Sequence, residues 1–200
     1  MMTAMFGTLL TFEMEATVFY WEYGDKSYGI IPYFLTKTII EIPFMFIFPV
    51  LFTVLTYFAI GYELDVGRFF FFAFSICMIV ICAASYGMVI SAIFKHGADT
   101  LAPVIMMPLI LFGGFFANAG DYPGYITWIQ YVSPIWYTLE SLFWNEFHDN
   151  TTYDHMWRDP LDLFGFHLGK WQCILYLAIL AISTWFMALI FLRLLVQKLQ

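Results

Sequence analysis

Charged side chains are scarce in this sequence. Only 12% of its 200 residues are Asp, Glu, Lys or Arg, whereas about a quarter are charged in a soluble domain. Apolar residues make up 62% of the chain, which excludes both an ordinary soluble globular fold and intrinsic disorder. Lys and Arg number only eight, they form no run, and the net charge is −7. Nucleic acid is therefore excluded as a partner.

Residues that could carry out chemistry are also few. The three cysteines all lie in apolar stretches, where small buried hydrophobic residues are expected, and their spacing fits neither a disulfide framework nor a metal site. The phosphate-binding loop GxxxxGK[ST] and the nucleophile motif GxSxG do not occur. The four histidines share no ligand spacing, and three of them lie in an acidic loop that is better explained as solvated. We therefore expect no catalytic residue and no metal site.

Long stretches without charge are what the sequence does contain. Five such intervals are 18 to 26 residues long, namely 42–62, 69–94, 100–120, 122–139 and 171–192. A helix rises about 1.5 Å per residue, so about 20 residues cross a hydrocarbon core of about 30 Å. None of the five intervals contains histidine, which disfavours an intramembrane enzyme because such enzymes place ionisable residues inside the bilayer. The sequence predicts an all-α, polytopic membrane protein.

The intervals divide the chain into segments. Residues 1–12 are too short to cross alone and are expected to be the end of a span that begins outside this sequence. Residues 13–33 are polar and interrupted by glycine, which fits an amphipathic helix and turn at the membrane surface or a plain solvated connector. Full spans are expected at 34–62, 69–94, 100–116 and 171–192. Lys37 and Glu41 are four residues apart, so they can reach the membrane interface or each other, and a pair extending to the interface is favoured.

The interval before the last polar stretch has a different character. Residues 122–139 contain two prolines, four tyrosines and two tryptophans, and these aromatic residues prefer the headgroup level of a bilayer. We expect a re-entrant hairpin at 121–140 and a polar loop at 141–170. Just before the hairpin, Gly113 and Gly114 indicate a helix end with close packing.

Two observations suggest an orientation. If the 13–33 connector, the turn at 95–99 and the C-terminus share a side, that side collects five of the eight basic residues, which favours a cytosolic location. Asn150 begins the glycosylation sequon Asn-Thr-Thr, which then falls on the extracellular or luminal side. Both arguments require that the hairpin does not cross the membrane.

Several strings then occur in one order along the chain: VFYWE, YFLTKTIIEIPF, ASYGMVISA, PLILFGGFFAN and WIQYVSPIWYTLESLFWNEF. The most specific pieces are Lys37 with Glu41-Ile42-Pro43-Phe44, the run GGFFAN that begins at Gly113, and Tyr137 with Glu140 and Asn145-Glu146-Phe147. Over residues 7–195 the chain resembles the second part of the transmembrane domain of G-type ABC transporters, the White and pleiotropic-drug-resistance-like group. The resemblance implies a helical bundle of ABC-2 architecture with a re-entrant extracellular hairpin.

The resemblance also implies functional residues. The connector over 13–27 resembles the coupling helix that rests on the nucleotide-binding domain, and Glu15 lies on it. Glu22 matches the family's acidic residue there, but Trp21 stands where an arginine is common, so this chain departs from the family's usual charge pattern at that position. Phe115 and Phe116 match an apolar plug between a central cavity and an exit. Cavity residues of the fifth span match the face formed by Met106, Met107, Ile110 and Leu111.

The function implied by the resemblance is ATP-driven export of lipids or other hydrophobic small molecules by alternating access. ATP and magnesium would bind a nucleotide-binding domain that this chain does not include, supplied in cis or in trans. The expected partners are a second half transporter, forming a homo- or heterodimer, together with the lipid bilayer and a hydrophobic substrate. The expected location is the plasma membrane or an endomembrane of a eukaryote. The alternative is a non-transporting membrane scaffold or a degenerate fragment of such a transporter.

Overall fold

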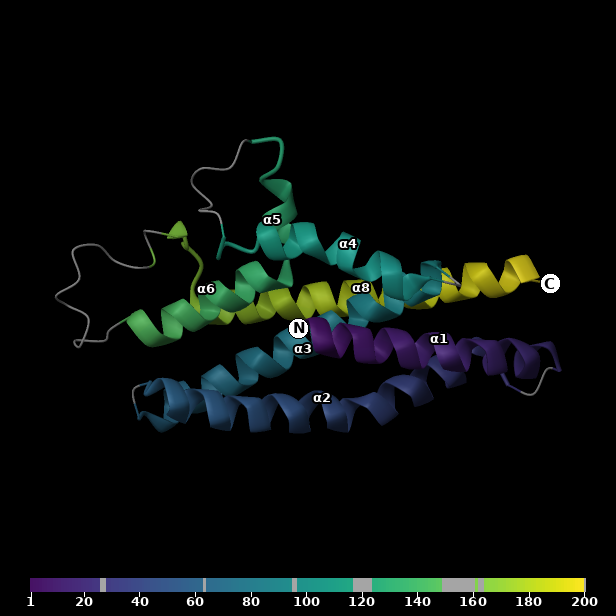
Figure 1. The fold of residues 1–200 in the computed structure, drawn as a ribbon, viewed down its shortest axis with the longest axis horizontal. Coiled ribbons are helices and arrows are strands. Elements are labelled where there is room, and N and C mark those ends of the chain that lie inside the picture. Colours follow the sequence, from purple (N-terminus) through teal and green to yellow (C-terminus); the bar gives the residue numbers. More distant parts are fainter. Residues whose placement is uncertain are drawn as a thin grey trace. The chain divides into compact units, whose positions relative to one another are not determined.

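The computed structural model describes residues 1–25, 28–62, 64–94, 97–116, 124–148, 161 and 164–199, and within these ranges the regular structure is helical, without strands. The main helices, in chain order, are α1 (Met2–Gly24), α2 (Ile30–Ile60), α3 (Val66–Ile93), α4 (Ala98–Leu111), α5 (Trp128–Val132), α6 (Pro134–Phe147) and α8 (Lys170–Leu199) (Figure 1). The predicted all-α fold is confirmed.

Within the described ranges, three helices are long and apolar enough to cross a membrane: Ile30–Ile60, Val66–Ile93 and Lys170–Val196. The helix α2 continues through Pro43 and Pro49, as neighbouring groups in membrane proteins allow. The helix α4 has 14 residues, a length of about 21 Å, which is less than the hydrocarbon thickness of about 30 Å. The helix α4 alone is therefore too short to form the full span that we expected at 100–116.

Two segment boundaries differ from the sequence-based expectation. The helix α1 runs without interruption through residue 13, where we expected a span to end and a connector to begin. The helix α6 starts with Pro134 at its first turn and ends at Phe147, so residues 141–147 are helical and not part of a loop. The phenylalanine at position 143 explains the extension, because its ring packs against Phe164 and Phe166 at centroid distances of 5.1 and 5.5 Å.

The chain divides into two compact units, which are described one at a time. The first unit comprises Met1–Phe48, Val80–Val104 and Ala181–Gln200. Its buried core draws on α1, α2, α3 and α8 and consists of Phe12, Phe19, Phe34, Met88, Val89, Ala188, Leu192 and Val196. Small and hydroxyl residues bring its helices together. The hydroxyls of Ser85 and Thr184 lie 2.6 Å apart, and a Cβ atom on Gly87 would lie 2.6 Å from the Met5 carbonyl oxygen.

The second unit comprises Pro49–Ile79 and Ile105–Leu180. Its core combines side chains from α3, α6, α8 and the segment before α8, namely Phe71, Trp136, Tyr137, Phe166, Cys173, Ile174 and Leu177. Gly114 has a φ of +87°, and a Cβ there would lie 2.8 Å from the Trp136 ring, while a Cβ on Gly113 would lie 2.7 Å from Ile135. The predicted helix end with close packing at these glycines is confirmed, because α4 ends at Leu111.

Candidate functional site

The first group of predicted site residues lies on α1 and α2 in the first unit. The Lys37 ammonium nitrogen is 2.8 Å from Glu15 Oε1 and 3.4 Å from Glu41 Oε1. Its side chain is only 7% exposed, so Lys37 does not extend to the interface as favoured from sequence. Glu41 also accepts a hydrogen bond from the Thr11 hydroxyl at 3.4 Å. Four polar side chains thus join the two helices.

Glu22 lies two turns after Glu15 on the same helix. Its carboxylate accepts a hydrogen bond from the Tyr28 hydroxyl across the turn that connects α1 to α2. Burial, together with the hydrogen bond to Glu22 and the charge of its carboxylate, raises the pKa of Tyr28 to about 12, so the hydroxyl stays protonated at physiological pH. The neighbouring Trp21 is 77% exposed. The end of α1 therefore presents a large apolar ring beside a carboxylate that is already fixed by a tyrosine.

The predicted plug residues follow the end of α4. Phe115 and Phe116 are 63% and 66% exposed, and their rings meet edge to face with centroids 5.1 Å apart. Their side chains are therefore not part of the unit's core. Both follow Gly114, whose positive φ and contact with Trp136 fix the turn against α6.

The predicted cavity residues occupy successive positions around α4. Met106 is completely buried within the second unit, whereas Met107 and Leu111 are 62% and 51% exposed. Ile110 lies between these extremes. Only the exposed part of this face is therefore available to a ligand or to another chain. The glycosylation candidate Asn150 lies outside the described residues.

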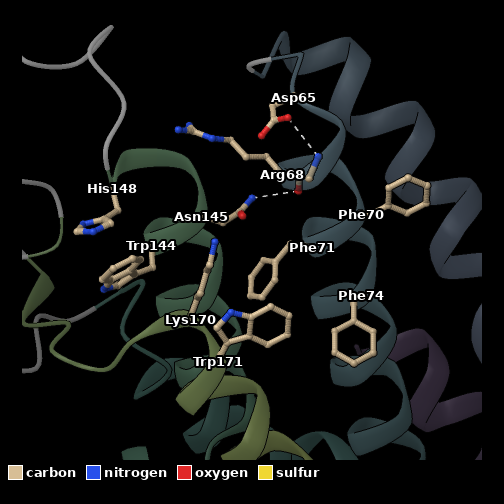
Figure 2. Close-up of a pocket in the computed structure, with 11 residues that line it drawn as sticks. Asp65, Arg68, Phe70, Phe71, Phe74, Trp144, Asn145, His148, Lys170 and Trp171 are labelled. Carbon is tan, nitrogen blue, oxygen red and sulfur yellow. Dashed lines mark hydrogen bonds between the residues drawn. The ribbon is translucent and has the colours of Figure 1, made fainter.

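A pocket that the sequence analysis did not identify lies in the second unit (Figure 2). It has a volume of about 630 Å³ and is lined by the first turns of α3 and α8, the end of α6 and Asp65 before α3. The lining contains one arginine, Arg68, and one lysine, Lys170, and its aromatic rings come from Phe70, Phe71, Phe74, Trp144, His148 and Trp171. Neither Arg68 nor Lys170 was a predicted site residue, because nothing in their spacing along the chain indicates that they share a pocket.

Reciprocal hydrogen bonds hold one wall of this pocket. The Asn145 amide nitrogen donates to the Arg68 carbonyl oxygen at 3.1 Å, and Arg68 Nη1 donates to the Glu146 carbonyl oxygen at 3.1 Å. The other amide atom, Asn145 Oδ1, is buried and accepts no hydrogen bond. The residue is only 4% exposed, and an unsatisfied buried acceptor is costly. A donor brought by a ligand or by water would satisfy it.

The Lys170 side chain forms the opposite wall. Figure 2 shows its ammonium group pointing toward the Asn145 amide, with the rings of Phe71 and Trp171 beneath. The ammonium nitrogen lies 5.4 Å from the centre of the Phe71 ring, within the range of a cation–π interaction. Phe71 and Trp171 meet edge to face with centroids 5.4 Å apart. Lys170 is therefore held in the pocket lining by its contact with the Phe71 ring.

Glu140, one of the residues that carried the family resemblance, has a structural contact. Its side chain is completely buried, and Oε1 accepts a hydrogen bond from the Leu168 amide at 2.5 Å. This bond joins the middle of α6 to the segment that leads into α8. It therefore helps to fix the position at which Lys170 starts α8.

Comparison with known proteins agrees with the helical architecture. Residues 1–147 match the family described as "ABC-2 type transporter". The protein white of Ceratitis capitata is 35% identical over 146 residues, and that of Drosophila melanogaster is 34% identical over 147 residues; each alignment covers 72% of this chain. ABC transporter G family member 22 of Arabidopsis thaliana is 31% identical over 147 residues, again 72% of this chain.

The alignments cover only a part of these relatives. They include 22% and 21% of the two white proteins and 19% of the Arabidopsis transporter, so the chain spans about a fifth of the length of the curated relatives that it matches. The family match nevertheless covers most of the chain, and the long apolar helices fit a membrane domain. The chain belongs to the ABC-2 type transporter family and is related to the White and G-family ABC transporters.

Proposed function

We propose that this chain forms part of the membrane pathway of an ATP-driven transporter that exports lipids or other hydrophobic small molecules. The observation that carries the proposal is the ABC-2 match over residues 1–147, supported by three helices that are able to cross a membrane. Relatives named as G-family ABC transporters and pleiotropic drug resistance proteins place the match in a transport family. ATP and magnesium bind a separate nucleotide-binding domain, in cis or in trans.

The second half of α1 is the coupling element in this proposal. Closure of the nucleotide-binding domains pushes on the exposed Trp21 and the Glu22 side chain at its end. The motion is passed to α2 through Lys37, which contacts carboxylates of both helices. Lys37 is buried and contacts Glu15 of α1 as well as Glu41 of α2, so separating the helices removes one of its two carboxylate partners. The two helices therefore move together.

The exposed face of α4 and the two following rings form the substrate path. Met107 and Leu111 offer flexible apolar surface to a hydrophobic substrate, with Ile110 and the buried Met106 behind them. Phe115 and Phe116 close the exit when they meet the equivalent rings of a second half transporter. Alternating access then opens the inner and outer ends in turn.

The remaining parts of the proposal concern assembly and location. The protein works as a homo- or heterodimer in the plasma membrane or an endomembrane of a eukaryote, with the connector cytosolic. Asn150 then lies on the extracellular or luminal side and is glycosylated. The competing hypothesis is a membrane scaffold that does not transport.

A transport assay distinguishes these functions. The full transporter, with its nucleotide-binding domains, is reconstituted in liposomes together with a fluorescent phospholipid or a hydrophobic dye. ATP-dependent movement of the probe supports export, and a variant whose nucleotide-binding domain binds but does not hydrolyse ATP is the control. A correctly assembled protein that moves neither class of probe, and whose ATP turnover no probe stimulates, would indicate a scaffold.

A further inference from the structure

The pocket is lined by the first turns of α3, the end of α6 and the start of α8. The helix α3 begins at Val66 and α8 begins at Lys170, and both are candidate membrane spans. Arg68 and Lys170 therefore lie in the first turn of a span, where side chains meet lipid headgroups. Trp144 and Trp171, which also line the pocket, are of the residue type that is enriched at this level.

The charges of the pocket match a group that carries both signs. Arg68 and Lys170 offer cationic donors, the groups that bind phosphate in proteins. Asp65 lines the same pocket, and its Oδ1 accepts a hydrogen bond from the Gly67 amide at 3.2 Å. A carboxylate among the lining residues disfavours a ligand that carries only negative charge. A ligand with a phosphate and an ammonium satisfies both groups.

The carboxylate of Asp65 selects among such ligands, because it is exposed in the pocket lining and accepts hydrogen bonds. A primary ammonium supplies N–H donors, whereas a quaternary ammonium has none. Phe70 and Phe74 are one helical turn apart on α3 and are 66% and 43% exposed, which provides apolar surface for acyl chains next to the headgroup.

From this geometry we propose that the pocket binds a phosphatidylethanolamine molecule of the surrounding bilayer. Its phosphate contacts Lys170 and the Arg68 guanidinium, its ammonium contacts Asp65, and its acyl chains lie along α3. The site is separate from the proposed substrate path on α4. The bound lipid fills the space between the starts of two spans and the end of α6, so it stabilises the second unit.

Native mass spectrometry of the detergent-purified full transporter tests the proposal. The probes are phosphatidylethanolamine, phosphatidylcholine and phosphatidylglycerol with the same acyl chains, and phosphoethanolamine without chains. We expect phosphatidylethanolamine to be retained most strongly. Lys170→Gln should weaken its retention about tenfold, the loss expected for one hydrogen bond between charged groups. Lys170→Arg should restore part of it.

The matched control is Arg193→Gln, which removes an exposed cation near the other end of α8 and should leave retention unchanged. A photoactivatable group on the acyl chain should label the peptide around Phe70 and Phe74.

Equal binding of phosphatidylcholine would contradict the role of the ammonium, and stronger binding of phosphatidylglycerol would show a site for anionic lipid. If phosphoethanolamine binds as strongly as the lipid, the role of the acyl chains is contradicted. Unchanged retention of the lipid in Lys170→Gln would overturn the site. None of these measurements depends on ATP or transport.

Discussion

The Lys37 ammonium lies 2.8 Å from a Glu15 carboxylate oxygen, which places a charged contact between two helices that are otherwise joined mainly by apolar packing. Lys37 is almost fully buried, whereas the Glu15 side chain is 51% exposed. The two side chains therefore contribute unequally to the stability of the protein. Removing the lysine leaves Glu41, its intrahelical partner at 3.4 Å, without its cation, while removing Glu15 leaves Lys37 still paired with Glu41.

We therefore expect Lys37→Gln to be more damaging than Glu15→Gln. Leaving a buried polar partner unsatisfied costs about 1–3 kcal/mol, whereas a half-exposed ion pair contributes less because solvent screens it. The thermal denaturation midpoint of the detergent-purified transporter measures the difference. The double variant should be no less stable than Lys37→Gln alone, since the two residues share one interaction. Additive losses would show that the contact contributes little.

The position of Glu22 leads to a prediction about coupling. Its carboxylate is fixed by the Tyr28 hydroxyl at the end of α1, so Glu22→Ala removes both a charge and the anchor of the connecting turn. Transport by the reconstituted full protein should fall, while its nucleotide-binding domains still bind ATP. Tyr28→Phe should cause a smaller loss that is the same at pH 6 and pH 9, because a pKa of about 12 keeps the hydroxyl protonated throughout this range. Normal substrate-stimulated ATP turnover in Glu22→Ala would count against α1 as the coupling element.

Close helix approach at Gly87 gives a prediction about stability. A Cβ at this position would lie 2.6 Å from the Met5 carbonyl oxygen, so α1 and α3 must separate to accept a methyl group. Gly87→Ala should lower stability by about 1–3 kcal/mol, as overpacking does. Gly7→Ala is the matched control, because a Cβ at Gly7 in α1 would meet nothing within 4 Å. Equal denaturation midpoints for the two variants would show that the helices adjust without cost.

The location of Asn150 can be tested by glycosylation. If the polar segment after α6 is extracellular or luminal, the full protein made in eukaryotic cells should carry a glycan at this sequon. Glycosidase treatment should then increase its mobility on a gel, and Asn150→Gln should abolish the shift. A reporter inserted near residue 154 that gives a cytosolic signal would overturn the orientation.

Sequence patterns predicted the helices better than the contacts between them. Charge-free intervals identified α2, α3 and α8 because the bilayer imposes a length and an apolar composition on any span. The end of α6 was missed because residues 141–147 mix polar and aromatic side chains, and their helix is stabilised by packing on Phe164 and Phe166. The pocket was missed for a related reason. Arg68, Asn145 and Lys170 are far apart in sequence, and only the fold brings them together.

The two rings after α4 provide the most direct test of the proposed gate. Phe115 and Phe116 are exposed and contact each other edge to face, so truncating both to alanine removes little core packing. The variant should therefore fold and form dimers, but its basal ATP turnover or its leak should rise several-fold, because the apolar seal no longer resists opening. Trp136→Ala is the comparison, since this buried ring contacts Gly114 and belongs to the core; it should lower stability by about 3–5 kcal/mol. If the double phenylalanine variant folds with normal coupling and normal leak, or loses as much stability as Trp136→Ala, the two rings are structural and the gate lies elsewhere.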